Sequence, residues 1–427
     1  MAPDTSTATP TDAAILEAVA AEQADAVDLL ADLVREPSML GQEQGAQDIM
    51  AGVFGAMGLE VDRFEVDLAA ISHLPGFSPP LVDYSGRENV VGISRPKGPA
   101  QGRSLILNGH IDVVPPGDES QWTDPPFSPV VRDGRLYGRG GGDMKAGIVA
   151  YVAAMRALVR LGFRPAAPVY LQSVIEEECT GNGALACLHR GYRADAAIIP
   201  EPFNHTLMTA QLGVMWFTVD LQGTPAHVLD TSAGSNAIEA LFPIVQSLKR
   251  LEEAWNGADC RHACYEGHRH PINFNVGKIS GGDWTSSVPA VARFDLRVGF
   301  FPGKPLEEVK REVEDAIHAG TPNGITATVS YGGFHAEGAV MDLDWPMMKS
   351  LSAIHQEITG STIEHLASTA TTDARFFILY GDTPATCYGP EATRIHGIDE
   401  SVSLDSLHTV TKVLALFIAR WCGLERI

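Results

Sequence analysis

Residues 104–115 read SLILNGHIDVVP, an apolar run that ends in a histidine and an aspartate. Short runs rich in leucine, isoleucine and valine are typical of buried strands. Two similar runs follow, APVYLQSVI at 167–175 and ADAAIIP at 194–200. Between the first two runs, residues 144–161 have helical periodicity. This alternation of strand and helix predicts an α/β sheet.

The order of elements changes in the middle of the chain. Residues 209–333 contain strands and two amphipathic helices in the order β-α-β-β-α-β, which is typical of a small ferredoxin-like module. The α/β pattern then returns, with helices expected near 346–359 and 404–421. A chain of 427 residues is also longer than one hydrophobic core normally serves. We therefore expect one domain built from 12–208 and 334–427, with 209–333 inserted into it.

The composition indicates a folded protein with an acidic surface. A formal net charge of -22 makes duplex nucleic acid and anionic membranes poor partners. The six cysteines follow no disulfide spacing, which favours a reducing compartment. Residues 1–11 are small and polar without the features of a signal peptide, and no apolar run is long enough to cross a bilayer. The interpretation is a cytoplasmic protein with a disordered tail over 1–11.

Acidic and histidine side chains follow the predicted strands. His110 ends the first run, with Asp112 two residues on, and three glutamates at 176–178 directly follow the second. Glu201 follows the third. In open α/β sheets, ligands bind beyond the carboxyl ends of the strands. Three adjacent carboxylates after a buried strand repel one another unless cations or protons offset them, so a functional site is favoured over a surface cluster.

The glycine-rich stretch GRGGGDMKAG at 138–147 places Asp143 where a helix is expected to start. A helix cap is the simple interpretation. A phosphate-binding loop is disfavoured, because aspartate stands where the dinucleotide fingerprint needs glycine and no strand is expected immediately before it. Histidine with oxygen ligands suits zinc, and one carboxylate shared between two cations would reduce their repulsion. His396 lies in a turn-rich stretch and His227 lies just after an alternating strand, and a lone histidine in such a place is more often structural.

Several segments, in this order, resemble the co-catalytic zinc hydrolase family of aminoacylases, acetylornithine deacetylase, succinyl-diaminopimelate desuccinylase and carboxypeptidase G. The resemblance covers nearly the whole chain after the tail. It implies a phosphorylase/hydrolase-like mixed-sheet catalytic domain with an inserted ferredoxin-like α+β domain that acts as lid and dimer contact. The segments that carry it are NGHIDVVP, YGRGGGDMKAG, EEECTGNG, PEP, GTPAHV and RIHGIDE.

The resemblance also implies two zinc ions per subunit, for which cobalt or manganese are possible substitutes. One zinc would be bound by His110 and Glu201, and the other by Glu178 and His396. Asp143 would bridge them, through a cis peptide bond to Met144.

The remaining roles follow from the same resemblance. Asp112 would orient His110 by placing its carboxylate on the second ring nitrogen. Glu177 would be the general base that takes a proton from the metal-bridging water, with a supporting part at most for Glu176. His227 would reach across a homodimer interface to the oxyanion of the reacting carbonyl. Polarised water, a general base and an oxyanion donor together are sufficient to hydrolyse an amide.

Departures from the family pattern bear on the substrate. Ser286 in WTSSVP replaces an asparagine found in many members, and YGGFHAEG at 331–338 lacks the arginine with which carboxypeptidase-like members hold a carboxylate. Arg394 remains available for an anion. The layout is closest to the deacylase branch, which includes formyl-aminopyrimidine deformylase. We therefore predict an amidohydrolase that removes an acyl group from a small N-acyl amine or N-acyl amino acid.

Two other functions compete with this prediction. A metallopeptidase, either a dipeptidase or a carboxypeptidase, would use the same metals. A binding protein that kept the fold is disfavoured, because it has no need of a general base such as Glu177. A further group of cysteines and histidines, at 260, 262, 264, 268 and 270, is spaced irregularly for zinc, and a polar loop explains it as well as a third metal does.

Overall fold

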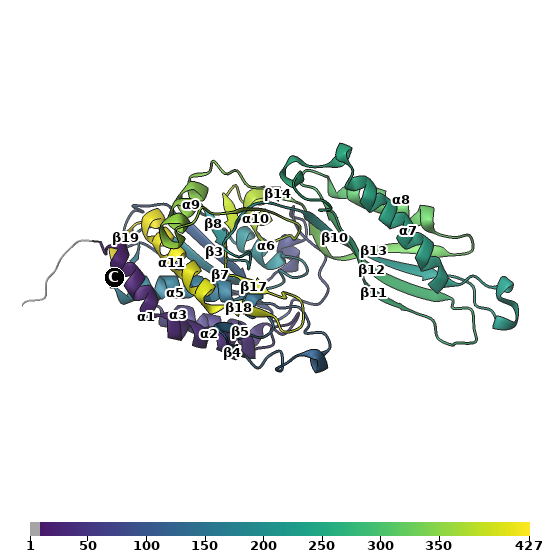
Figure 1. Cartoon of the computed structure of the whole chain (residues 1–427), viewed down its shortest axis with the longest axis horizontal. Coiled ribbons are helices and arrows are strands. Elements are labelled where there is room, and N and C mark those ends of the chain that lie inside the picture. Colours follow the sequence, from purple (N-terminus) through teal and green to yellow (C-terminus); the bar gives the residue numbers. More distant parts are fainter. Residues whose placement is uncertain (1–8) are drawn as a thin grey trace, which may run out of the picture.

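The computed structural model describes residues 9–427, so most of the tail expected over 1–11 lies outside the described residues. The chain forms a larger body from which a smaller α+β unit projects at one end (Figure 1). Helix α1 (Asp12–Ala21) begins at Thr11, whose Oγ1 accepts a hydrogen bond from the Ala14 amide at 3.3 Å. Among these residues, no helix combines the length and the hydrophobicity needed to span a bilayer.

A six-stranded sheet forms the centre of the larger body. Strands β7, β3, β8 and β16 are mutually parallel, whereas β1 and β2 run antiparallel to their neighbours. The mixed sheet confirms the predicted fold class. In spatial order the strands are β1 (Glu60–Glu65), β2 (Glu88–Ser94), β7 (Val169–Val174), β3 (Leu105–His110), β8 (Ala197–Ile199) and β16 (Ala385–Cys387).

Helices cover both faces of this sheet. On β2, Val90 joins the main core, and the next residue, Val91, points to the opposite face, where it packs with Cys187 of α6. On the first face, α5 packs against α11 and against β3 and β7. The helices of the larger body after α1 are α2 (Gln23–Arg35), α3 (Gln44–Ala56), α4 (Leu68–Ile71), α5 (Ala146–Arg160), α6 (Asn182–His189), α9 (Pro346–Thr359), α10 (Ala374–Tyr380) and α11 (Leu404–Cys422).

The projecting unit has the predicted β-α-β-β-α-β order, and its antiparallel strands lie in the order β11-β12-β10-β13. Helices α7 and α8 lie side by side on one face of this sheet (Figure 1). Phe217 and Val219 of β10 face the helices and are buried. The elements are β10 (Gly213–Gln222), α7 (Ala237–Trp255), β11 (Phe274–Gly281), β12 (Val291–Phe300), α8 (Leu306–Gly320) and β13 (Thr326–Ala336). We call this unit the lid.

Three small sheets complete the fold. Strand β9 pairs with β14 and β15 next to the lid. The predicted boundary between residues 208 and 209 falls inside β9, and the predicted boundary between residues 333 and 334 falls inside β13. The three sheets are β14 (Ala339–Val340), β9 (Leu207–Gln211) and β15 (His365–Ser368); β17 (Ala392–Thr393), β18 (Ser401–Ser403), β5 (Arg135–Tyr137) and β4 (Val130–Arg132); and β19 (Leu424–Arg426) with β6 (Phe163–Pro165).

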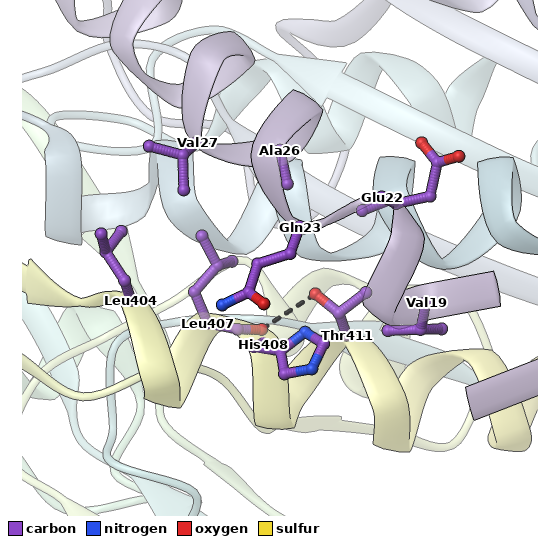
Figure 2. Close-up of a pocket in the computed structure, with 10 residues that line it drawn as sticks. Val19, Glu22, Gln23, Ala26, Val27, Leu404, Leu407, His408 and Thr411 are labelled. Carbon is purple, nitrogen blue, oxygen red and sulfur yellow. Dashed lines mark hydrogen bonds between the residues drawn. The ribbon is translucent and has the colours of Figure 1, made fainter. Parts of the chain in front are cut away.

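A small hollow lies where the break between α1 and α2 faces α11 (Figure 2). Its volume of about 10 Å³ leaves room for about one water molecule. Glu22, at the break, is 5% exposed, and its carboxylate is neutralised by Arg160 Nε at 2.7 Å. The hollow is therefore a packing feature of the three helices and not a ligand site.

Candidate metal centre

Three parallel strands bring the predicted ligands to one edge of the central sheet. His110 is the last residue of β3, Glu177 and Glu178 follow β7, and Glu201 follows β8. Because these strands are parallel, their carboxyl ends meet at the same edge. The side chains of His110, Glu177 and Glu201 are all at least nine-tenths buried.

Asp143 lies between the two predicted histidine ligands. Its Oδ1 is 3.2 Å from His110 Nε2, and its Oδ2 is 3.3 Å from His396 Nε2. Glu178 Oε2 lies 3.1 Å from His396 Nε2. The peptide bond from Asp143 to Met144 is cis, as the resemblance implied. A carboxylate with one oxygen directed to each histidine has the arrangement that a shared ligand of two cations needs.

The glycine-rich segment that carries Asp143 differs from the sequence prediction in the elements on either side of it. A strand, β5, ends at Tyr137 directly before Gly138, although no strand was expected there. Residues Gly141–Lys145 then lead into α5, which begins at Ala146, and within them Asp143 (φ -109°, ψ 98°) and Met144 (φ -126°, ψ 30°) have non-helical backbone angles. Gly140 has φ of 76°, and a Cβ there would lie 2.2 Å from Val113, so glycine is required.

The other two carboxylates lie slightly farther from His110. Glu177 Oε2 is 3.9 Å and Glu201 Oε2 is 4.0 Å from its Nε2. Two sets of ligand atoms each fall within 4.8 Å of one another, namely His110 with Glu177 and Glu201, and His110 with Asp143 and Glu178. The five predicted metal ligands and Glu177 therefore form one cluster.

The electrostatics of the cluster are set by its buried carboxylates. Burial raises the pKa of Glu177 and of Glu201, and neighbouring carboxylates raise both further. Burial opposes protonation of His110, but Asp143 and the two glutamates outweigh it and raise the His110 pKa. Glu178 raises the pKa of His396. The raised pKa values of the two histidines come from the surrounding carboxylates, and the same negative charge would favour a bound cation.

Asp112 contacts His110, but not in the predicted way. His110 Nδ1 lies 2.9 Å from the main-chain oxygen of Asp112, whereas the nearest carboxylate oxygen is 3.7 Å away. The carboxylate instead accepts hydrogen bonds from the amides of Glu177 and Glu178, at 3.2 and 3.1 Å. Burial raises the pKa of Asp112 to about 7. Its main-chain oxygen thus fixes the imidazole, and its side chain fixes the glutamate turn.

Glu176 is turned away from the cluster. Its carboxylate is buried and binds Arg87 Nη1 and the Tyr84 hydroxyl, and Arg87 also binds Glu43. The sequence offered no local charge to offset the glutamate triplet, and the structure supplies one from 89 residues away. The repulsion within the triplet is thus relieved on one side by arginine.

A buried ion pair joins two segments of the site and was missed in the sequence. Arg139 Nη1 binds Glu400 Oε2, and Arg139 Nη2 donates to the main-chain oxygen of Gly397 at 3.1 Å. Glu400 Oε1 accepts from the amides of Gly142 and Asp143 at 3.0 and 3.1 Å. The pair thereby ties the loop that carries Asp143 to the turn that carries His396.

A cavity of about 440 Å³ opens onto the cluster. Asn273, Asn275 and Arg297 of the lid line it together with five side chains of the cluster: Asp143, Glu177, Glu178, Glu201 and His396. Asp373 lies close by and is fully buried, and neither of its carboxylate oxygens has a hydrogen-bond partner within residues 9–427. Burial raises the Asp373 pKa to about 6. None of Asn273, Asn275, Arg297 and Asp373 has a local sequence signal that marks a site.

His227 and the cysteine–histidine group lie away from the cluster. His227 is exposed in the lid, where its Nδ1 accepts from the Leu229 amide at 3.0 Å. His262 caps a short turn at Cys264, and His270 lies 3.0 Å from Glu252. In the described part of the chain, neither His227 nor the cysteine–histidine group belongs to a set of side chains placed to hold a metal.

Comparison with known proteins adds independent findings. A model of peptidase family M20/M25/M40 matches residues 106–420. The N-formyl-4-amino-5-aminomethyl-2-methylpyrimidine deformylase of Bacillus subtilis is 27% identical over 408 residues, which cover 90% of each chain. The succinyl-diaminopimelate desuccinylase of Rhodopseudomonas palustris is 26% identical over 93% of this chain and 98% of its own. The structure of the dipeptidase Dug1p from Saccharomyces cerevisiae shares the fold, with a TM-score of 0.77, 13% identity and coverage of 96% and 98%.

Proposed function

Since the chain belongs to the hydrolases of peptidase family M20/M25/M40, we propose that it removes a small acyl group from an N-acyl amine or N-acyl amino acid, using two zinc ions. The observation that carries this proposal is the position of Asp143, which directs one carboxylate oxygen to each of two histidines. In the proposal, His110 and Glu201 bind one zinc, and Glu178 and His396 bind the other.

The donor set fits this cofactor. Imidazole nitrogens and carboxylate oxygens are the ligands that zinc takes in hydrolases. Glu177 Oε1 is buried without a hydrogen-bond partner among residues 9–427, so it is free for a water or a substrate group. When bound, two divalent cations lower the pKa of a water molecule and polarise the scissile carbonyl.

Glu177 has the properties of the general base. Its carboxylate adjoins the cluster, with Oε2 3.9 Å from His110 Nε2. Burial raises its pKa, which makes it a better proton acceptor near neutral pH. It would take a proton from the attacking water and deliver it to the leaving amine. Asp112 holds the amide of Glu177 and so fixes the turn that presents the base.

The deacylase function is favoured by the two relatives that align along nearly the whole chain. Their names describe removal of a formyl group and of a succinyl group from an amine. The alternative is a metallopeptidase, either a dipeptidase or a carboxypeptidase, with the same cluster. The similarity to a dipeptidase structure concerns the fold alone, so it does not decide between a deacylase and a metallopeptidase.

We further propose that the chain is a homodimer and that the inserted unit, over about 209–333, supplies both lid and interface. His227 would then act on the partner's reacting carbonyl. Large apolar side chains are exposed around it, with Leu229 90% and Trp284 73% exposed. Exposed apolar side chains gathered in one place are typical of an interaction surface.

A reducing, cytoplasmic setting is part of the proposal. All six cysteines are free, and four of them are buried: Cys179, Cys187, Cys387 and Cys422. Burial raises the pKa of each of these four thiols, so they stay protonated and unreactive.

The test is hydrolysis of N-formyl, N-acetyl and N-succinyl amines and of dipeptides, with and without chelator and after zinc is restored. Release of an acyl group that stops with chelator and returns with zinc is the expected result. Cleavage of dipeptides alone would replace the proposal with the peptidase alternative. A Glu177→Ala variant that keeps turnover would contradict the assigned base.

A further inference from the structure

One buried arginine of the larger body has no part in the chemistry described above. Arg375, in the first turn of α10, is fully buried. Taking a guanidinium out of water is unfavourable unless its N–H groups are bonded and its charge is offset. Burial lowers the Arg375 pKa, and the negative charges of Asp373 and Glu177 oppose that shift. A cation kept in this position beside the metal cavity indicates that the arginine has a specific task there.

The guanidinium of Arg375 bridges two segments of the site. Its Nη2 donates to the main-chain oxygen of Thr180 at 2.9 Å, and its Nη1 donates to the main-chain oxygen of Thr372 at 2.9 Å. Thr180 belongs to the turn over 176–181, which carries Glu177 and which we call the glutamate turn. Thr372 lines the metal cavity. The planar fork of arginine can hold both oxygens at once, which the compact ammonium group of lysine cannot do in the same geometry.

The arginine fits closely against the glutamate turn. The amides of Thr180 and Gly181 donate to the main-chain oxygen of Glu176 at 2.9 and 2.7 Å. Gly181 has φ of 72°, and a Cβ there would lie 2.3 Å from Arg375 Nη2, so glycine is required. A displacement of the guanidinium would therefore shift the turn and, with it, the carboxylate of Glu177.

The lid contacts the same guanidinium. The Cζ of Arg375 lies 4.2 Å from the ring centroid of Phe376 and 5.6 Å from that of Phe334. Phe334 belongs to β13 of the lid and is buried. A guanidinium within about 6 Å of a ring centroid, over its face, is attracted by the ring. Arg375 is therefore a point of contact between the lid strand and the glutamate turn.

Hydrogen bonds hold the lid strand in place on both sides of Phe334. Segment 78–79 of the larger body accepts from the amide of Gly333 at 2.8 Å and from that of His335 at 3.0 Å. The same segment is joined by two hydrogen bonds, of 3.1 and 2.8 Å, to Asn182, which directly follows the glutamate turn. The ring of Phe334 is thus tied to the turn by two routes, through segment 78–79 and through the guanidinium.

We propose that Arg375 is a positioning residue that couples the lid to the glutamate turn, so that Glu177 is presented to the metal centre only while Phe334 covers the guanidinium. The inference rests on the proposed function, in which Glu177 is the general base. The coupling acts through the main chain of the turn, because Arg375 bonds to Thr180. Small displacements of a reacting group can lower a rate by as much as about 10²-fold, so the coupling should appear in kcat.

The first test is Phe334→Leu, which removes the aromatic face and keeps an apolar side chain. For whichever N-formyl, N-acetyl or N-succinyl amine the wild type hydrolyses fastest, kcat should fall about three- to tenfold. KM and zinc content should stay unchanged, because Phe334 does not line the metal cavity. The matched control is Phe163→Leu, which should leave kcat unchanged. This buried ring lies 4.6 Å from the guanidinium of Arg426, at the far end of α5 from the metal centre.

The second test is Arg375→Lys, which keeps the charge and loses the fork. It should lower kcat about 10²-fold. Adding Phe334→Leu to it should have little further effect, because the two side chains act as a pair, whereas independent structural losses would multiply. If Arg375→Lys does not fold, the comparison of Phe334→Leu with Phe163→Leu decides the proposal.

Hydrogen exchange of the backbone amides over 176–181, measured by mass spectrometry on the whole zinc-loaded chain, gives a readout separate from turnover. Phe334→Leu should speed this exchange about three- to tenfold, and Phe163→Leu should not. If the wild type hydrolyses none of the compounds, the proposed function fails, and the exchange rates alone decide the coupling.

Three results would overturn the coupling while the deacylase stands. The first is an active wild type in which Phe334→Leu matches Phe163→Leu in both kcat and exchange. The second is a lower kcat of Phe334→Leu without faster exchange over 176–181, because the turn would then not be what the ring holds. The third is a change in KM alone, which would place Phe334 in substrate binding.

Discussion

Removal of the Glu400 carboxylate should show how strongly the buried ion pair stabilises the metal centre. In Glu400→Ala, the amides of Gly142 and Asp143 lose their acceptor, and the guanidinium of Arg139 stays buried without its partner. Glu400 and Arg139 have side chains that are 1% exposed. Breaking a buried pair by removing one member costs about 3–5 kcal/mol.

The assay is urea unfolding of metal-free protein, together with zinc stoichiometry by calorimetry on folded protein. The matched control is Glu391→Ala, which removes a partly exposed carboxylate that lies 2.8 Å from Arg135 of strand β5. Because solvent screens that pair, its loss should cost only about 0–1 kcal/mol. We also expect Glu400→Ala to bind zinc more weakly, since Asp143 and His396 lose their common support. A variant as stable as the control, with two zinc ions at wild-type affinity, would refute this reasoning.

The other predictions concern single residues. Glu177→Ala should abolish turnover with zinc still bound, whereas Asp143→Ala should lose zinc, and elemental analysis beside a rate assay separates the two. His227→Ala should lower kcat by about 10²–10³-fold at unchanged zinc content, as loss of one oxyanion donor does; an unchanged kcat would remove His227 from the mechanism. Burial lowers the pKa of His335 to about 4 from its ordinary 6.5. The folded state therefore binds its proton less well, and stability should fall as pH drops from about 6.5 to 4. His335→Gln should lose that part of the pH dependence in thermal melts, and an identical profile would contradict the shift.

Four of the five proposed metal ligands have a local signal in the sequence. His110 and Glu201 come at the ends of apolar strands, Glu178 belongs to a glutamate triplet, and Asp143 stands in a glycine-rich turn. His396 has no such signal and was proposed from the family resemblance alone. The supports of these ligands could not be predicted, because the contacts join residues far apart in the chain. Arg87 meets Glu176 across 89 residues, and Arg139 meets Glu400 across 261.

Errors of detail have the same physical origin. The carboxylate of Asp112 was expected to contact His110, but it binds the amides of Glu177 and Glu178 instead. Spacing along the chain does not reveal these two amides, because they follow the neighbouring strand of the sheet. The order of elements in the lid was correct, because amphipathic periodicity is local. A second cavity, of about 270 Å³, was not foreseen, because its lining joins the lid sheet to Leu81 of the other domain.

The pairing of β10 with β13 bears on how such a protein could arise. Val214, near the start of the lid, is paired with Ala336, near its end. The chain therefore leaves and re-enters the larger body at neighbouring points. A short surface loop of the larger body could occupy the same place, because its two ends would lie equally close together. Insertions with this geometry disturb the host least, because no strand of the host has to be displaced. A whole lid could thus be acquired or exchanged between relatives as a cassette, while the metal centre kept its own sheet.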